Sequence, residues 1–293
     1  MKANLYLCST TFSYNLSDSI EVLKKKLSDF HLMIEKIREY NYENSLYMNH
    51  KDFTSIIIYN DGKSIYELIS QYEFTVSKYG KDIITILSAM FKYCQDSNVS
   101  QNEIEEYLNT HDKDCCNGII VLNPLKRDEN DIQVMSNISE WYNFRRFFLA
   151  KYPIDEHFFI DETKKYFPNL QIHESTKSLL KDVLKNHSHR IVEYLSILND
   201  FLIKEFNQIK NNDINNFLPL FALKYNIDGA SLEGQKDNKF MRIFPDGTRA
   251  YCEPHLKMYK DDSGNNNQHC RIYFKKPNKG ESIVYVGCIC QHL

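Results

Sequence analysis

The spacing of apolar residues changes near residue 239, and this change restricts the possible folds more than any other feature of the chain. Before it, apolar residues recur at three- and four-residue steps, which is typical of amphipathic helices; one such run is Ile191, Leu195, Leu198, Leu202 and Phe206. After it, apolar and polar residues alternate, which is typical of half-exposed strands. The chain of 293 residues holds only 9 glycines and 7 prolines, which favours long helices before the change.

A polar segment with two glycines, residues 226–238, lies at this change and is predicted to join two domains. We expect residues 1–238 to form a mostly helical body with a few short strands, and residues 239–293 to form an antiparallel β module. The predicted strands of the module cover residues 239–244, 249–259, 269–275 and 282–292. The predicted fold class is therefore α+β, with a helical N-terminal body and a small C-terminal four-stranded antiparallel sheet.

The cysteines and the N-terminal segment indicate the compartment. The first apolar stretch is too short for a signal peptide and is interrupted by Asn4, Ser9 and Thr10. No run reaches the ~18 apolar residues that a membrane-spanning helix requires. Eight cysteines without a secretion signal indicate reduced thiols. We therefore expect a cytoplasmic protein with no membrane partner.

The charge of the chain is unevenly distributed. The net charge is −3, yet from Lys239 onward nine lysines and arginines stand against five acidic residues. A basic module behind an acidic body favours an anionic partner, and we expect RNA or the ribosome.

One face of the predicted module collects ionisable and aromatic side chains. In the strands at 249–259 and 269–275, every second residue is polar or aromatic, and these residues share a face because side chains alternate along a strand. If the two strands are neighbours, this face is continuous. The residues are Arg249, Tyr251, Glu253, His255, Lys257, His269, Arg271, Tyr273 and Lys275.

This set suits the cleavage of RNA by its own 2′-hydroxyl. The reaction needs a base for that hydroxyl, an acid for the leaving 5′-oxygen and cations for the developing negative charge. We expect His255 with Glu253 to transfer protons, and Lys257 with Arg271 to hold the phosphate. Tyr251 and Tyr273 are predicted to stack on bases. Further RNA contacts are predicted for Arg249, His269 and Lys275. No metal and no other cofactor is required.

The ending HCRIYF…SIVYVGCICQHL resembles the terminal strands of RelE/YoeB-type toxins, which are ribosome-associated mRNA endonucleases. The resemblance covers about the last 55 residues. It implies that Arg271 binds phosphate and that His292 is catalytic or contacts substrate. The sequence departs from the family in its helical hairpin before the sheet, which here must come from residues 217–225 or elsewhere. It also implies a bacterial toxin or phage-defence setting. By strand alternation His292 falls on an apolar face, so this role requires a bulge near Gly287.

Two other sites compete with this interpretation. One is a zinc site formed by the four cysteines of the module, Cys252, Cys270, Cys288 and Cys290. The module has a Cys-x-Cys but no Cys-x-x-Cys motif. The spacing from Arg249 to His255 also matches the Arg-x5-His motif of helical HEPN ribonucleases. Pro254 lies within that spacing and argues against a helix.

A non-enzymatic protein is the alternative function. In that case the basic face docks a partner, as in an immunity or adaptor protein, and the helical body supplies a protein contact or a homo-oligomer interface. Arg145 and Arg146 follow the single tryptophan among aromatic residues, where an arginine pair either holds a phosphate or forms salt bridges between helices. Whether the module is an enzyme is open at this point, with a metal-independent endoribonuclease as the leading hypothesis.

Overall fold

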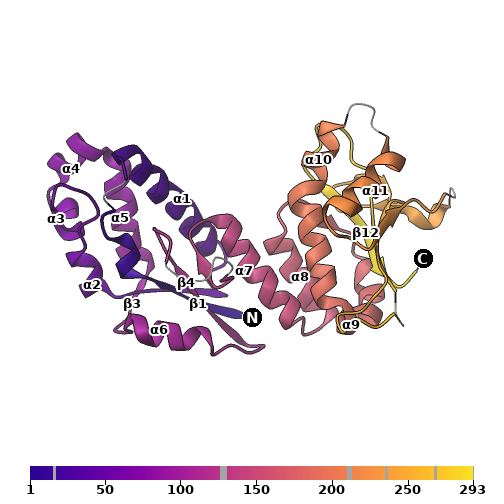
Figure 1. Ribbon diagram of the computed structural model, residues 1–293, viewed down its shortest axis with the longest axis horizontal. Helices are drawn as coiled ribbons and strands as arrows, with labels where there is room; N and C mark the ends of the chain where they lie inside the picture. Colours follow the sequence, from indigo (N-terminus) through magenta and orange to yellow (C-terminus); the bar gives the residue numbers. More distant parts are fainter. Residues whose placement is uncertain (16–17, 126–130, 210–212, 235–236, 267–268, 293) are drawn as a thin grey trace. The chain divides into compact units, whose positions relative to one another are not determined.

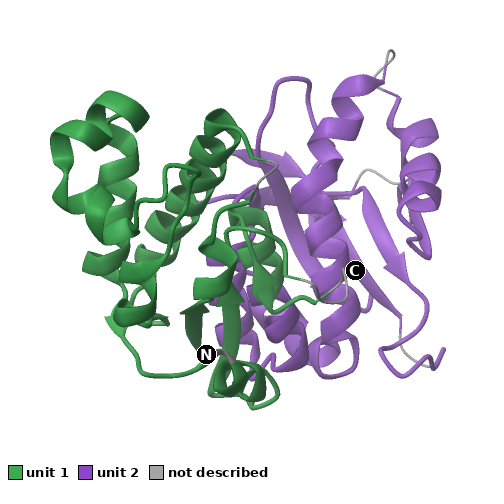
Figure 2. Cartoon of the chain, turned by 60° about the vertical axis from the view of Figure 1, so that its left-hand side comes forward, with its two compact units in different colours: residues 1–144 green, residues 145–293 purple. Residues whose placement is uncertain are grey.

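The computed structural model describes residues 1–293 except 16–17, 126–130, 210–212, 235–236, 267–268 and 293, and except the side chain of Gln101. The chain forms two compact units, Met1–Phe144 and Arg145–Leu293, which we call unit 1 and unit 2 (Figure 2). Each contains its own sheet and its own helices. None of the described helices is long and apolar enough to span a membrane.

Unit 1 alternates strands with helices (Figure 1). Its elements are β1 (Lys2–Leu7), the 3-10 turn η1 (Ser9–Phe12), α1 (Ile20–Arg38), β2 (Asn44–Met48), α2 (His50–Ser55), α3 (Ile65–Ser70), α4 (Tyr72–Tyr79), α5 (Lys81–Tyr93), β3 (Gln95–Asp96), α6 (Gln101–Leu108), β4 (Cys115–Ile120), β5 (Val134–Met135) and the start of α7 (Ile138–Lys151). Side-chain caps fix several helix starts, including capping boxes at Ser64 and Ser100.

The sheet of unit 1 is entirely parallel, in the order β3-β2-β1-β4-β5. The chain starts in the centre, builds outward on one side through β2 and β3, and then crosses back to the other side of β1. The direction of winding therefore reverses between β1 and β4. In open parallel sheets such a reversal creates a crevice at the carboxyl ends of the two strands, where ligands commonly bind.

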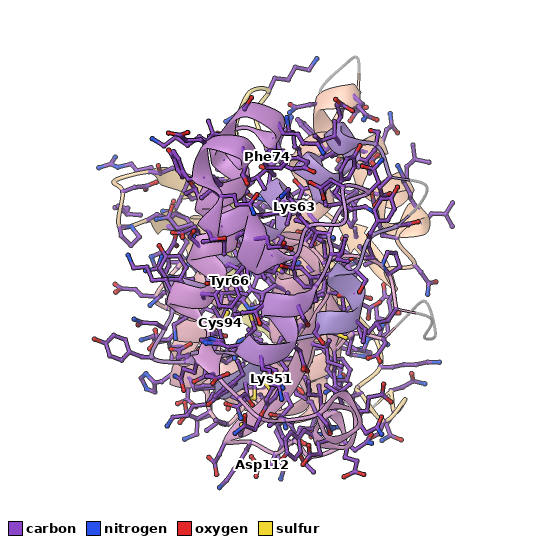
Figure 3. The ribbon with its side chains drawn as sticks, turned by 90° about the vertical axis from the view of Figure 1, so that its left-hand side faces the viewer. Lys51, Lys63, Tyr66, Phe74, Cys94 and Asp112 are labelled. Atoms are coloured by element: carbon purple, nitrogen blue, oxygen red, sulfur yellow. The ribbon has the colours of Figure 1, made fainter. Side chains whose placement is uncertain are left out.

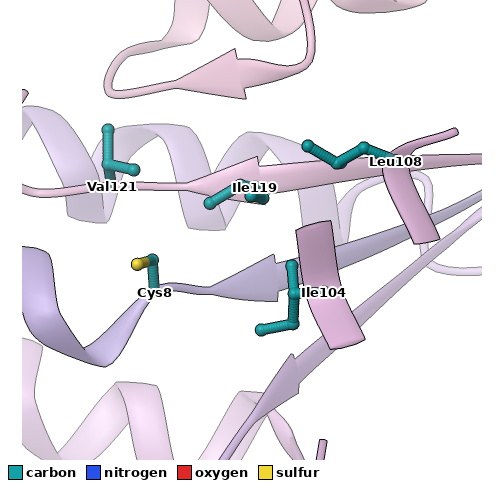
Figure 4. Close-up of a cluster of buried hydrophobic side chains, with 5 residues drawn as sticks. All are labelled: Cys8, Ile104, Leu108, Ile119 and Val121. Atoms are coloured by element: carbon teal, nitrogen blue, oxygen red, sulfur yellow. The ribbon is translucent and has the colours of Figure 1, made fainter. Parts of the chain in front are cut away.

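Both faces of the parallel sheet are covered. On one face α6 packs against β1 and β4 through Cys8, Ile104, Leu108, Ile119 and Val121 (Figure 4). On the other face Gly118 lies so close to Met135 that a Cβ at position 118 would be 2.7 Å from its Cε, and 3.1 Å from a ring atom of Phe144 in α7. Coverage on both faces explains why β4 is buried along almost its whole length, whereas β1 and β2 alternate between buried and more exposed residues.

Unit 2 begins within α7 and ends in a second five-stranded sheet. Its elements are α8 (Glu156–Tyr166), β6 (Leu170–Ile172), α9 (Thr176–Ile197), the π-helical turn η2 (Leu198–Leu202), α10 (Ile203–Gln208), α11 (Ile214–Lys224), β7 (Gly229–Ser231), the 3-10 turn η3 (Asn238–Phe240), β8 (Met241–Ile243), β9 (Arg249–Tyr251), β10 (His255–Met258), β11 (Cys270–Phe274) and β12 (Val284–Cys290). The strand order is β6-β12-β11-β10-β7, with β6 parallel to β12 and every other pair antiparallel. β8 and β9 form a separate two-stranded sheet.

Buried arginines fix the first helices of unit 2. Arg145 donates to the carboxylate of Glu162 in α8 at 3.1 Å, and both side chains are fully buried. Arg146 donates to Asp200 at 2.7 Å and to the carbonyl of Tyr166 at 2.8 Å. These bonds satisfy charges that burial would otherwise penalise. The arginine pair is thus engaged in salt bridges between helices, which was one of its two predicted roles.

The predicted fold class is wrong. The chain is about 49% helical and 18% strand, but its N-terminal part holds a five-stranded parallel sheet and its C-terminal sheet is mixed. The predicted boundary at residue 238 falls inside unit 2, because β6 and β7, which precede it, pair with β12 and β10, which follow it. The predicted strand 249–259 is divided at Pro254 into β9 and β10, which belong to different sheets.

Candidate functional site

A carboxylate, Glu233, lies at the centre of a polar cluster on unit 2. Its Oε1 accepts hydrogen bonds from a terminal guanidinium nitrogen of Arg271 and, at 2.9 Å, from the hydroxyl of Tyr273. The same oxygen is 3.6 Å from Nε2 of His255 and 4.0 Å from Nε2 of His292. Arg271 also donates to the hydroxyl of Tyr273 at 3.2 Å. We call these five residues the Glu233 cluster.

Strand pairing brings the cluster together. β10 pairs with β11 so that His255 faces Tyr273 and Lys257 faces Arg271. Paired residues of neighbouring strands project to the same face, so His255, Lys257, Arg271 and Tyr273 share one face, as the alternation predicted. β7 pairs with the other edge of β10, with Ser231 opposite His255, and this pairing places Glu233 two residues further along.

His255 is buried, and its hydrogen bonds fix one tautomer of the ring. Its side chain is only 1% exposed. Its Nδ1 lies 3.1 Å from the carbonyl oxygen of Glu253, an acceptor that requires a proton on Nδ1. Burial lowers the pKa of His255 to about 4, so the ring is neutral near pH 7. Nε2 then carries a lone pair and accepts from the hydroxyl of Ser231 at 3.2 Å.

Glu233 is ionised near neutral pH. Burial opposes its ionisation, but the Tyr273 hydroxyl and the positive charge of Arg271 outweigh burial and lower its pKa. Tyr273 shows the opposite shift: burial raises its pKa, and its bond to Glu233 raises it further. Tyr273 therefore remains a hydrogen-bond donor to the carboxylate.

His292 reaches the cluster because of a β-bulge in β12. Tyr273 pairs with Cys288 but Phe274 pairs with Val286, which leaves Gly287 as the extra residue. Glycine is required there, since a Cβ at Gly287 would lie 2.5 Å from the Cβ of Cys252. The bulge turns the following residues to the face of Tyr273. His292, whose side chain is 55% exposed, thereby lies near Glu233.

The remaining predicted site residues lie around the cluster or away from it. The Glu253 carboxylate accepts from the backbone N–H of Gly234 at 2.7 Å, so it fixes the segment that carries Glu233 and does not contact His255. Lys257 is partly exposed beside Arg271. Tyr251 is partly buried, and its hydroxyl accepts from the N–H of Asp237 at 3.1 Å.

Three predicted RNA contacts lie outside the cluster. Arg249 is exposed on the two-stranded sheet of β8 and β9. His269 is exposed just before β11 and packs edge-on against the ring of Tyr259. Lys275 forms an ion pair with Glu281 and lies over the ring of Tyr285.

Glu233 itself was missed in the sequence. It lies in the polar segment 226–238 that we interpreted as a linker. The available signal was weak: the residues Gly229–Ser231 are a short strand whose small side chains do not alternate in polarity. Only the pairing of β7 with β10 brings Glu233, two residues beyond the end of β7, beside the sheet.

The cysteines of unit 2 do not converge as a zinc site would require. Cys288 and Cys290 share the face of Tyr273, whereas Cys270 projects to the opposite face of β11. Among the residues that the structure describes, no group of three or more His, Cys, Asp or Glu side chains is placed to hold a metal ion.

Unit 1 offers a second location, at the carboxyl ends of β1 and β4. The Thr11 hydroxyl donates to the carbonyl of Cys8 and accepts from the N–H of Leu122. Asn123 donates to the carbonyl of Thr11 at 2.7 Å and accepts from Nζ of Lys26 at 2.7 Å. These bonds join the two strand ends across the point where the winding reverses.

A shallow apolar hollow of about 310 Å³ lies elsewhere on unit 1, among α2, α3 and α5. It is lined by Tyr66, whose position is labelled in Figure 3, and by Thr54, Ile69, Ser70, Ser88 and Phe91. Hydroxyl and apolar groups make up this lining, which has no carboxylate, guanidinium or imidazole among its residues, unlike the Glu233 cluster.

Comparison of this chain with family models, with curated proteins and with solved structures found no match.

Proposed function

We propose that unit 2 is a metal-independent RNA-cleaving module whose reaction centre is the Glu233 cluster. The proposal rests on three groups of the Glu233 cluster. The guanidinium of Arg271 and the half-exposed imidazole of His292 both lie within 4.0 Å of Oε1 of the ionised Glu233 carboxylate. A base, a cation and an acid are the groups that cleavage by a 2′-hydroxyl requires.

The exposure of each group suggests its role. Glu233 is ionised and partly exposed, so it is the base that accepts the proton of the 2′-hydroxyl. His292 is the most exposed member, and it donates a proton to the departing 5′-oxygen. Arg271 stabilises the negative charge that develops on the phosphorus-bound oxygens, with Lys257 beside it.

His255 has a different role from the one predicted. A side chain that is 1% exposed and bonded through both ring nitrogens is poorly placed to meet a substrate. His255 is therefore a positioning residue, which holds Ser231 and the strand β7 beside Glu233. Because its ring is neutral, His255 does not place a second positive charge beside the Glu233 carboxylate.

The resemblance to RelE/YoeB-type toxins agrees with this assignment. It implied a phosphate contact for Arg271 and a catalytic or substrate contact for His292, and both residues belong to the Glu233 cluster. A ribosome-bound mRNA is accordingly the first substrate to test, in a bacterial toxin or phage-defence setting.

Unit 1 is proposed to regulate this module. Its parallel sheet has the reversal of winding at which small ligands bind in other open α/β sheets. Lys26 and Asn123 provide polar groups at that edge.

A non-enzymatic docking protein remains the alternative. It is favoured by the fact that Arg271 and Glu233 already neutralise each other, as in a salt bridge that only stabilises the sheet. In that case the basic face of unit 2 binds a partner without cleaving it.

One comparison of variants separates the two functions. The full-length chain is incubated with total RNA, and separately with translating ribosomes, in the presence of a metal chelator. We expect cleavage with 2′,3′-cyclic phosphate ends, and a loss of about 100-fold in rate for His292→Ala. His269→Ala is the matched control, because His269 is an exposed histidine of the same unit outside the cluster. Absence of cleavage by the unmodified chain, or equal rates for the two variants, would contradict the enzymatic proposal.

A further inference from the structure

Two cysteine side chains lie side by side at the end of β12. Cys288 and Cys290 are two residues apart on one strand, so both project to the face of Tyr273 and Arg271. Their sulfur atoms are 3.9 Å apart. They pack with Phe240 and Tyr273 and are 1% and 4% exposed, respectively.

The two thiols are not equivalent. Either S–H can donate to the other sulfur, and the contact between the two thiols lowers the pKa of Cys290 and raises that of Cys288. Cys290 also pairs across the sheet with Arg271, whose positive charge favours a thiolate. Because Cys290 is the thiol opposite Arg271, we assign it as the nucleophile and Cys288 as the thiol that reacts with its oxidised form.

We propose that Cys288 and Cys290 form an oxidisable dithiol whose co-reactant is a small peroxide. The Cys290 thiolate attacks one oxygen of hydrogen peroxide, which breaks the O–O bond, gives a sulfenic acid and releases hydroxide. The Cys288 sulfur then attacks the sulfur of the sulfenic acid, and hydroxide leaves as the disulfide forms. In total, two thiols lose two electrons and two protons, and one peroxide is reduced to two molecules of water.

Disulfide formation has a structural consequence for the Glu233 cluster. The sulfurs must move from 3.9 Å to about 2.05 Å apart. Successive same-face Cα atoms of an extended strand lie near the upper limit of the span that a disulfide tolerates, so the end of β12 must bend. His292 follows Cys290 by two residues and moves with it. This step rests on the proposed function: oxidation is expected to reduce RNA cleavage.

The test uses the full-length chain treated with hydrogen peroxide and then digested with trypsin after alkylation under denaturing conditions. Residues 280–293 follow Lys279, contain no lysine or arginine, and hold both cysteines in one peptide. We expect this peptide to lose two hydrogen atoms and to escape alkylation until dithiothreitol is added. The peptide that ends at Arg271 holds Cys270 alone and is expected to alkylate fully, which makes it an internal control.

Cys288→Ser removes the second thiol. In this variant Cys290 is expected to remain as a sulfenic acid that dimedone captures, and the loss of two hydrogens is expected to vanish. Circular dichroism verifies that the variant folds, and Cys288→Ala serves as a second variant. Peroxide treatment that leaves both thiols alkylatable, or that adds oxygen to either sulfur without joining them, would overturn the dithiol.

The cleavage assay tests the consequence separately. Oxidised protein is expected to cleave RNA about 100-fold more slowly than reduced protein, because displacement of a catalytic group by about 1 Å has effects of this size. Reduction is expected to restore the rate. A disulfide that forms without changing the rate would refute the regulatory consequence. A disulfide that forms in a chain whose reduced form never cleaves RNA would refute the proposed function and leave the dithiol intact.

Discussion

Both units are built on five-stranded sheets, but they place their polar groups differently. In unit 1 all strands of the sheet are parallel and the central strands β1 and β4 are covered on both faces, so polar side chains collect at the carboxyl edge, where Lys26 meets Asn123. In unit 2 antiparallel strands β10 and β11 expose part of one face, and the Glu233 cluster lies on that face. The comparison shows that the parallel sheet leaves polar groups only beyond its strand ends, whereas the antiparallel sheet also contributes strand residues, here His255, Arg271 and Tyr273.

The largest loss of stability is expected on acidification, because of His255 in the Glu233 cluster. His255 has a pKa of about 4 when folded, below its ordinary value of 6.5, so the unfolded chain binds more protons between these pH values. The neutral His255 therefore contributes fully to the free energy of unfolding above pH 6.5. This contribution, about 2–3 kcal/mol, is lost as the pH falls toward 4. Urea unfolding of the full chain from pH 7.5 to 4.5 measures this loss.

His255→Gln sharpens that measurement, because glutamine keeps a hydrogen-bonding side chain but does not titrate. The slope of stability with pH is expected to be smaller in this variant than in the unmodified chain. Equal slopes would show that the loss of stability on acidification does not come from His255.

Closely packed glycines provide a second comparison of the two sheets. Gly287→Ala in unit 2 puts a Cβ 2.5 Å from the Cβ of Cys252, which is anchored to backbone, and we expect a loss of about 1–3 kcal/mol. Gly118→Ala in unit 1 meets first the flexible end of Met135, so its loss should be smaller. Thermal unfolding of the two variants ranks them. A larger effect at position 118 would show that the bulge of β12 is not tightly constrained.

The smallest loss of stability is expected for a substitution at the carboxyl edge of the sheet of unit 1. Lys26→Met removes an ion pair with Asp18 and a bond to Asn123, both partly exposed, so we expect a loss below about 1 kcal/mol. A larger loss by urea unfolding would mean that Lys26 holds the strand ends together and is unsuited to a ligand.

The sequence predicted the local pattern of unit 2 better than the fold of either unit. The alternation around His255 and Arg271 indicated correctly that these residues share a face, because side chains alternate along a strand; it did not indicate that His255 and Tyr273 on that face are buried. The bulge that the role of His292 required is present at Gly287.

What the sequence did not reveal depended on distant pairing. The parallel sheet of unit 1 was missed because the few short strands expected there gave no indication that they pair with one another; β3 has two residues, and β2 has the unremarkable sequence Asn44–Met48. Glu233 was missed because β7 becomes a strand only through its pairing with β10. The buried state of His255 likewise depends on the elements packed around it, which strand alternation alone does not report.

The central claim is that Glu233 is the base of an RNA-cleaving site, and single-turnover cleavage of RNA by Glu233→Gln tests it most directly. Glutamine keeps the shape and the hydrogen bond to Arg271 but cannot accept the proton, so the rate should fall by about 10²- to 10⁴-fold. Glu281→Gln is the matched control, because Glu281 also pairs with a cation of unit 2, Lys275, outside the cluster, and its rate should be unchanged. A folded Glu233→Gln variant that cleaves RNA as fast as the unmodified chain would contradict the account.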